Sequence, residues 1–176
     1  MLTENEREAF AIHIIEEVRR WSGVQMRPHA SVNADEASDG VEFRVNGRQI
    51  GHVHGNCAVH LALTKALKDA IVSENLAEPL EAAPTSSWAM FNPVHPDDVG
   101  RATWLLRLNY VRLRRQHLTL GAAATSASLQ KHESAIAAVS AKTAAVLQRT
   151  QVRSQRRPLP SLDTGLGGSG GSIATA

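Results

Sequence analysis

The amino-acid sequence predicts an α+β fold, in which a small antiparallel sheet is covered by an N-terminal, a middle and a C-terminal helix. Residues 41–54 have the pattern of two short strands joined by Asn46-Gly47, the pair that two-residue hairpin turns prefer. Helical spacing of apolar residues occurs before this hairpin and twice after it. A hairpin with helices grouped apart from it is typical of an antiparallel sheet with one covered face.

The N-terminal helix is predicted over residues 4–21. Thr3 and Glu6 have the spacing of a capping box at its start, and Gly23 is a stop signal after its end. The apolar residues that repeat at helical spacing are Phe10, Ile14, Ile15, Val18 and Trp21. Pro28 and the polar residues 31–40 then predict an irregular loop.

The two-residue turn also predicts the register of the hairpin. Counting outward from the turn pairs Phe43 with Ile50 and Val41 with His52. Because directly opposed residues share a face of the sheet, His52 is expected on the apolar face. His54, two residues further along the same strand, is expected to extend that row.

One or two further strands and two helices complete the predicted domain. A strand is predicted over 57–63, with Val59 and Leu61 on its inner face, and a helix over 64–76. A short strand follows at 88–91. The last helix runs from the N-cap position Asp97 to about residue 118, and its expected buried stripe is Val99, Thr103, Leu106, Tyr110 and Leu113.

The composition changes after residue 120, which sets the predicted boundary of the folded domain at 1–120. Residues 121–151 are alanine-rich and predict a marginal helix, in which 122–150 offer a segment for self-association. Residues 152–176 are first basic and then rich in glycine and serine, so disorder is expected there.

Charge and cysteine content restrict the classes of partner and location. Residues 1–120 carry a net charge of −2, although the whole chain carries +2, so a nucleic-acid partner is not expected. The sequence has no apolar run long enough to span a membrane and no signal-peptide pattern, and Cys57 is the single cysteine. A cytoplasmic location is the expectation. The last helix carries five arginines: Arg101, Arg107, Arg112, Arg114 and Arg115. The last three fit either the C-terminal dipole of the helix or an anion or nucleic-acid contact.

Histidines provide the main chemical signal in the sequence. His52 and His54 lie two apart on one strand, and three convergent imidazoles with His60 could bind a metal ion or supply a general base. His60 alternates with Val59 and Leu61, so it is expected to point away from the core and outside the site. The spacing lacks the paired ligands of a structural zinc site, and no metal is expected. The other histidines are interpreted as ordinary surface or loop residues: His13, His29, His95, His117 and His132.

Several motifs together resemble the luciferase-domain family, which is named for the fungal luciferases. They are the segment 43–55 with its Gly-His-Val-His-Gly sequence, Ala77-Glu78-Pro79, Ser87-Trp88-Ala89-Met90-Phe91, and Asp98-Val99 with Leu108-Asn109-Tyr110. The resemblance covers roughly residues 5–115. It implies an α+β domain and an oxygenase that needs no cofactor and oxidises a hydroxylated pyrone or a similar enolic molecule with molecular oxygen.

The resemblance also implies roles for individual residues. His52 and His54 would be the catalytic base or polar anchors, and Trp88 would help to exclude water from the product. The residues expected to line the substrate pocket are Phe43, Ile50, Trp88, Phe91 and Tyr110. The chain departs from its bacterial relatives after Glu78-Pro79, where Leu80 and Glu81 replace two histidines and Thr85 and Ser87 replace an acid and a glycine.

The alternative interpretation is a non-catalytic binding module for a protein or nucleic-acid partner. It would use the sheet face or the basic end of the last helix. An enclosed His52 and His54 favour the enzyme, whereas an exposed pair with arginines beside it favours the binding module.

Overall fold

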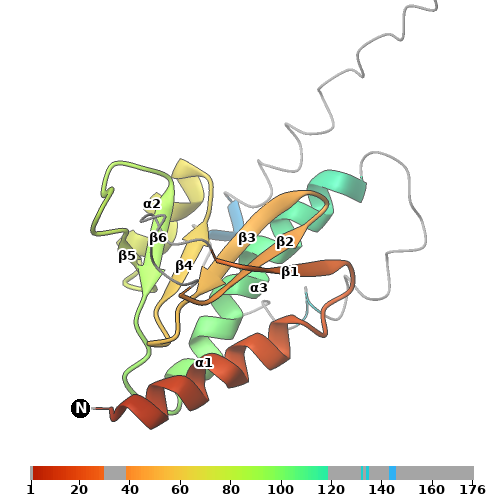
Figure 1. Ribbon diagram of the computed structural model, residues 1–176. Coiled ribbons are helices and arrows are strands. Elements are labelled where there is room, and N and C mark those ends of the chain that lie inside the picture. The colour runs from red at the N-terminus through yellow and green to blue at the C-terminus, as the bar shows by residue number, and fades with distance from the viewer. Residues whose placement is uncertain (1, 30–38, 119–131, 133, 135–142, 146–176) are drawn as a thin grey trace, which may run out of the picture.

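The computed structural model of the protein describes residues 2–29, 39–118, 132, 134 and 143–145. Within them, six strands form one antiparallel sheet in the order β1-β2-β3-β4-β6-β5 (Figure 1). The predicted α+β class is confirmed. In chain order the elements are α1 (Glu4–Val18), β1 (Val24–Pro28), β2 (Val41–Val45), β3 (Arg48–Val53), β4 (Val59–Ala62), α2 (Lys65–Ser73), β5 (Glu78–Pro79), β6 (Trp88–Phe91) and α3 (Asp98–Leu118).

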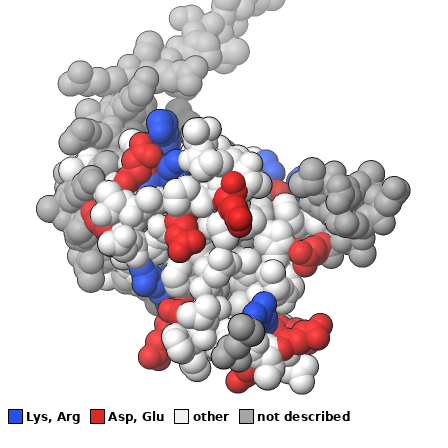
Figure 2. All heavy atoms as spheres, turned by 90° about the vertical axis from the view of Figure 1, so that its left-hand side faces the viewer, with Lys and Arg blue, Asp and Glu red and all other residues white. Residues whose placement is uncertain are grey.

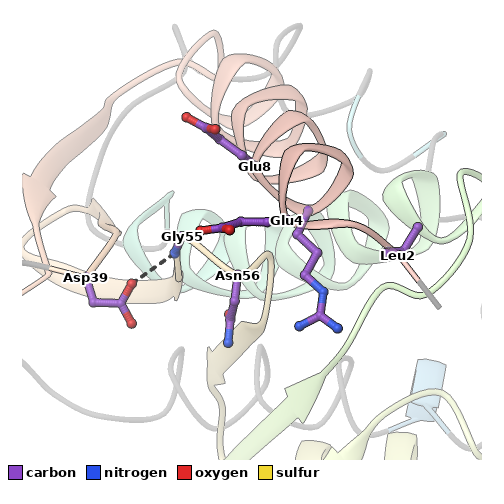
Figure 3. Close-up of a pocket in the computed structure, with 7 residues that line it drawn as sticks. Leu2, Glu4, Glu8, Asp39, Gly55 and Asn56 are labelled. Atoms are coloured by element: carbon purple, nitrogen blue, oxygen red, sulfur yellow. Dashed lines mark hydrogen bonds between the residues drawn. The ribbon is translucent and has the colours of Figure 1, made fainter.

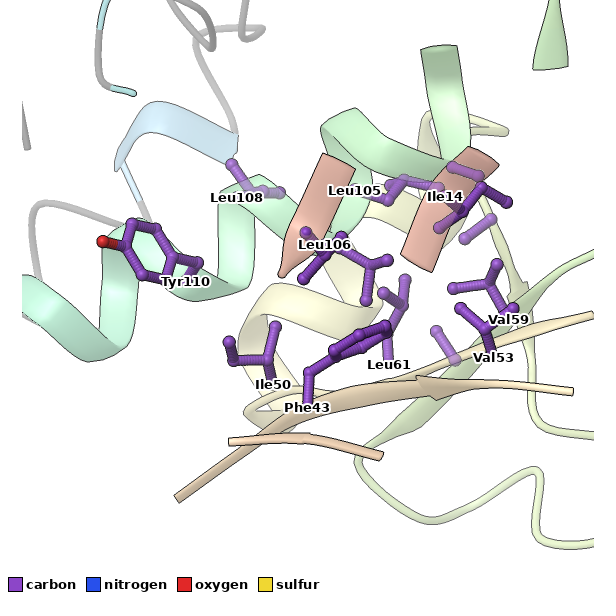
Figure 4. Packing of buried hydrophobic residues seen from close by; sticks show 14 of the residues in the cluster. Ile14, Phe43, Ile50, Val53, Val59, Leu61, Leu105, Leu106, Leu108 and Tyr110 are labelled. Carbon is purple, nitrogen blue, oxygen red and sulfur yellow. The ribbon is translucent and has the colours of Figure 1, made fainter. Parts of the chain in front are cut away.

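The three helices contribute to one hydrophobic core, which lies against one face of the sheet (Figure 4). Phe43 of β2 and Leu61 of β4 are fully buried there, and so is Leu106 of α3. The whole predicted stripe of α3 is buried, from Val99 to Leu113. These helices cover one face of the sheet. The described side chains on the other face are not part of this core.

The predicted capping box at the start of α1 is confirmed. The hydroxyl of Thr3 accepts a hydrogen bond from the backbone N–H of Glu6, and the Glu6 carboxylate accepts one from the backbone N–H of Thr3. We expect Thr3→Ala to lower the free energy of unfolding by about 1 kcal/mol, because two N–H groups at the helix start lose their reciprocal partners. Urea unfolding would measure this loss, and a change below ~0.3 kcal/mol would contradict the assigned role of the cap.

The hairpin contains a β-bulge that the sequence prediction lacked. Asn46 and Gly47 both have positive φ, at 52° and 74°, as a tight hairpin turn requires. Beyond the turn, however, Arg44 pairs with Gln49 while Phe43 pairs with Gly51. Ile50 is therefore the extra residue of the bulge.

The bulge reverses the predicted orientation of the histidines. Because side chains alternate along a strand, one extra residue moves every later side chain to the opposite face. His52 pairs with Glu42, and Val53 takes the position opposite Val41 that was predicted for His52. The prediction that His52 and His54 lie on the apolar face is therefore wrong.

Asn109 of α3 joins two strands where their pairing ends. The last paired residues of β3 and β4 at this end are Gly51 and Leu61. One step further on, the Asn109 amide nitrogen donates to the carbonyl oxygens of Ile50, at 2.6 Å, and Ala62, at 2.9 Å. Asn109 is fully buried, so its side chain replaces the ladder hydrogen bonds that both carbonyls lack beyond this point.

Gly51 is required where β3 faces α3. A Cβ atom at this position would lie 2.3 Å from the backbone oxygen of His60 and 3.0 Å from a methyl carbon of Leu106. The glycine of the Gly-His-Val-His-Gly motif thus allows β4 and α3 to approach the backbone next to the bulge.

The arginines of α3 mostly contact the protein itself. Arg107 donates to Glu17 of α1 at 2.8 Å, and Arg112 is buried and donates to the Asn109 side-chain oxygen at 2.8 Å. The guanidinium of Arg101 bonds a backbone carbonyl in the segment after α2. On the side shown in Figure 2, basic side chains lie among acidic ones. Binding of a macromolecular partner by the basic helix end stays a prediction.

Further differences from the sequence prediction concern two strands and the end of α1. Strands β1 and β5 were not predicted, and α1 ends at Val18 rather than at residue 21. Most of the predicted segments 121–151 and 152–176 lies outside the described residues, including nearly all of the proposed self-association segment. None of the described helices is both long and apolar enough to cross a membrane.

Candidate functional site: a histidine cluster

Four histidines meet on the sheet face opposite the helices, and we call them the histidine cluster: His29, His52, His54 and His60. His52 and His60 are direct cross-strand neighbours on β3 and β4. His54 follows β3 by one residue, and His29 follows β1. Alternation puts all four on the face that carries Glu42, because the bulge has turned His52 and His54 away from the core.

Three ring nitrogens of the cluster point at one another. The Nε2 atom of His52 lies 2.9 Å from Nδ1 of His60, and Nε2 of His54 lies 3.3 Å from the same atom. The rings of these three residues are steeply inclined to each other, at 67° to 78°. The nitrogens of His52 and His54 therefore both approach Nδ1 of His60.

His29 covers the cluster from one side. Its ring stacks on that of His52 with a centroid distance of 3.7 Å and an interplanar angle of 15°. This contact and the neighbouring rings leave His52 only 6% exposed. One nitrogen from each of His29, His52 and His54 lies within 4.8 Å of the others, a grouping compatible with a metal ion.

A carboxylate orients His54. Oδ2 of Asp39 lies 3.0 Å from Nδ1 of His54, and Oδ1 accepts a hydrogen bond from the backbone N–H of Gly55 at 3.1 Å. Burial works against the charged carboxylate, but these two hydrogen bonds hold the pKa of Asp39 below its ordinary value. An ionised carboxylate only accepts hydrogen bonds, so Nδ1 of His54 carries the hydrogen and Nε2 presents a lone pair.

Two other polar or aromatic groups surround His52. The carboxamide of Gln49 lies 3.2 Å from Nδ1 of His52. The ring of Trp88, on β6, lies 5.5 Å from the imidazole of His52 and is partly exposed. Trp88 thus forms an aromatic edge of the histidine cluster.

Burial and mutual repulsion lower the pKa of three members of the cluster. Burial, followed by the positive charges that His29, His60 and His54 would carry, lowers the pKa of His52 to about 3. Burial and the neighbouring histidines lower the pKa of His60 to about 4. The pKa of His29 is lowered for the same reasons, although Glu42 and Asp39 oppose the change.

The structure brings together only part of the predicted site. His52 and His54 lie together, with Trp88 beside them. The remaining predicted pocket residues lie elsewhere: Phe43 and Ile50 are fully buried in the core on the other face, Tyr110 donates to the Ser22 carbonyl, and Phe91 contacts the guanidinium of Arg101. The structure therefore does not bring these four residues to the histidine cluster, and their role in a substrate pocket stays a prediction.

Sequence reasoning left out two members of the cluster, His60 and His29, and the carboxylate of Asp39 beside it. His60 points away from the core as predicted, but that direction leads into the cluster. His29 was interpreted as an ordinary loop residue, and His132 likewise, yet His132 is buried against Trp21 and Tyr110. The sequence signal for the bulge was Gly51 inside a strand, because a strand glycine often marks one.

A groove of about 720 Å³ runs beside the cluster, between the start of α1 and the turn after β3 (Figure 3). Asp39 lines this groove and is also the hydrogen-bond partner of His54. Its other lining residues are Leu2, Glu4, Arg7, Glu8, Gly55 and Asn56. The groove gives a small molecule access to the carboxylate that orients His54.

Comparison with known proteins agrees with the motifs in the sequence. The model of the Luciferase domain family matches residues 47–109, just over a third of the chain. This segment begins at the hairpin turn and includes His52, His54, His60, Trp88 and Asn109. No curated protein and no solved structure matches the chain. Residues 47–109 of this chain are therefore similar to the Luciferase domain.

Proposed function

We propose that the protein is an oxygenase that oxidises an enolic or hydroxylated aromatic small molecule, such as a pyrone, with molecular oxygen. The observation that carries this proposal is the pair formed by Asp39 and His54 inside the histidine cluster, within 3.0 Å of each other. The match to the Luciferase domain over residues 47–109 supports the reaction class.

His54 is the proposed general base. Asp39 fixes the ring with the Nδ1 hydrogen towards the carboxylate, so Nε2 accepts the proton of the substrate hydroxyl. The carboxylate then stabilises the imidazolium that forms, as the acid of a catalytic triad does for its histidine. The electron pair of the broken O–H bond stays on the substrate, and the resulting enolate donates electrons to dioxygen.

Trp88 and His52 are proposed to position the substrate. The partly exposed Trp88 ring offers a flat surface on which an aromatic or pyrone ring can stack, 5.5 Å from the His52 ring. His52 is buried and held by Gln49 and His60, which makes it a fixed polar wall rather than a mobile base.

Oxygen consumption with a 4-hydroxy-2-pyrone tests the proposal. In the presence of EDTA, we expect His54→Ala to reduce the rate by about 100-fold or more, because a positioned base contributes about 10²–10⁴. Asp39→Asn should reduce it less and shift the pH profile. His13→Ala, a change at an exposed histidine outside the cluster, is the matched control and should keep the wild-type rate.

Two results would contradict the proposed base. The first is a wild-type rate in His54→Ala. The second is equal loss in His54→Ala and His13→Ala, which would assign the effect to general destabilisation rather than to proton transfer.

A further inference from the structure

We propose that the histidine cluster also binds a divalent transition-metal ion, with Nε2 of His52, Nε2 of His54 and Nδ1 of His60 as ligands. This inference does not depend on the proposed oxygenase activity. It rests on three observations. Imidazole nitrogens of three residues lie close together, the far nitrogens of His52 and His54 have polar partners, and one lone pair within the cluster lacks a hydrogen-bond donor.

The spacing of the nitrogens fits one ion. Three nitrogens bound tetrahedrally to a metal at about 2.1 Å lie about 3.4 Å apart. The two distances from Nδ1 of His60, to His52 and His54, are 2.9 Å and 3.3 Å. Both distances are close to the separation that a bound ion needs, and small ring rotations would adjust them.

The hydrogen bonding of the cluster is incomplete without a cation. His54 presents the lone pair of Nε2, since its Nδ1 hydrogen is directed to Asp39. His60 has one hydrogen at most on Nδ1, yet this atom lies within hydrogen-bonding distance of both His52 and His54. One hydrogen cannot satisfy two acceptors fully, whereas a cation at the shared point attracts all three lone pairs.

The surrounding groups have the arrangement that metal-binding histidines use. The carboxylate of Asp39 on the far nitrogen of His54 fixes the tautomer that leaves Nε2 free for the ion. The Gln49 amide nitrogen faces the far nitrogen of His52, and a half-turn of this carboxamide would place its oxygen there to accept the Nδ1 hydrogen in the same role. An all-imidazole set suits Zn²⁺, Cu²⁺, Ni²⁺ or Fe²⁺ and disfavours Mg²⁺ and Ca²⁺.

His29 stands outside the set of three ligands. Its ring stacks nearly parallel on that of His52, and one of its nitrogens lies within 4.8 Å of nitrogens of His52 and His54. His29 is therefore assigned to the cover of the site, and the His29→Ala variant tests whether it is a fourth ligand. A bound ion occupies the same lone pair of His54 that accepts the substrate proton, so metal binding and proton acceptance exclude each other.

Titration of the chelator-stripped full-length protein with Co²⁺ tests the site. We expect one equivalent to produce the visible absorption of tetrahedral cobalt, and Zn²⁺ to displace it. His54→Ala and His60→Ala should each weaken binding at least 100-fold, and Asp39→Asn about 10- to 100-fold, as loss of a carboxylate behind a ligand does. His29→Ala should change it by less than tenfold, and His13→Ala should leave it unchanged.

Several outcomes would overturn the metal site. They are the absence of a cobalt spectrum, binding that His60→Ala leaves intact, or equal weakening by His13→Ala. His60→Gln, which keeps a polar side chain of similar length, separates loss of a ligand from loss of the fold, with circular dichroism as the check. Since no substrate is present, failure of this test leaves the oxygenase proposal standing, and failure of the oxygen assay in EDTA leaves the metal site standing.

Discussion

Asn109→Ala is expected to lower the free energy of unfolding by about 3 kcal/mol, because the buried Ile50 carbonyl loses its donor and the Ala62 carbonyl keeps only the longer 3.4 Å bond from Arg112, at about 1–3 kcal/mol for each unsatisfied group. The Asn109 amide nitrogen bonds the oxygens of Ile50 and Ala62 at 2.6 Å and 2.9 Å. The buried Arg112 also loses its acceptor, the Asn109 side-chain oxygen. A loss of this size is a large fraction of the total stability of a small domain.

Urea unfolding of Asn109→Ala beside Asn92→Ala would measure this effect. Asn92 is exposed, so its substitution should change stability by less than about 0.5 kcal/mol. Asn109→Asp is a second test, because it keeps the shape of the side chain but replaces both N–H donors with an acceptor. A loss below ~1 kcal/mol in Asn109→Ala would show that water satisfies the two carbonyls equally well.

Acidification is expected to destabilise the metal-free protein between pH 6.5 and about 4.5. The pKa values of His52 and His60 are lowered in the folded state from 6.5 to about 3 and about 4. The unfolded chain therefore takes up protons at these residues near pH 6.5, whereas the folded protein does not. Their contribution to stability is fully present above pH 6.5 and is lost as the pH falls towards the folded-state values, by up to about 1.4 kcal/mol per pH unit for each histidine.

Urea midpoints at several pH values in EDTA would measure this dependence. Asp39 has a lowered pKa as well, but as a carboxylate it loses its contribution only below about pH 4, outside this window. A double variant, His52→Gln with His60→Gln, should flatten the dependence, whereas His13→Gln should retain it. Equal slopes in the double variant and the wild type would contradict the assignment to these two histidines.

The sequence predicted most of the elements because their signals are local. The capping box of Thr3 and Glu6, the turn at Asn46-Gly47 and the buried stripe of α3 each depend on residues close together in the chain. Strand β1 escaped prediction because its residues, Val24–Pro28, are largely exposed and lack apolar alternation. Its strand conformation comes from pairing with β2, which is a tertiary effect.

The composition of the candidate site was only partly predictable. His52 and His54 were identified from their spacing, but the face they occupy depends on a bulge one residue long. His29 and Asp39 reach the cluster from the two ends of the segment 30–38, and no sequence spacing relates them to β3. Asn109 belongs to a quoted family motif, yet its structural role appears only where β3 and β4 separate.

The bulge at Ile50 makes the site depend on the length of the hairpin as well as on its residues. Deleting one residue between Asn46 and His52 would preserve every histidine and nearly all of the motif, yet would turn His52 and His54 towards the core. Two relatives with the same histidines and hairpins that differ by one residue would therefore place those histidines in different environments. Inheritance of activity in such a lineage would be decided by insertions and deletions, which a comparison of residue identities alone overlooks.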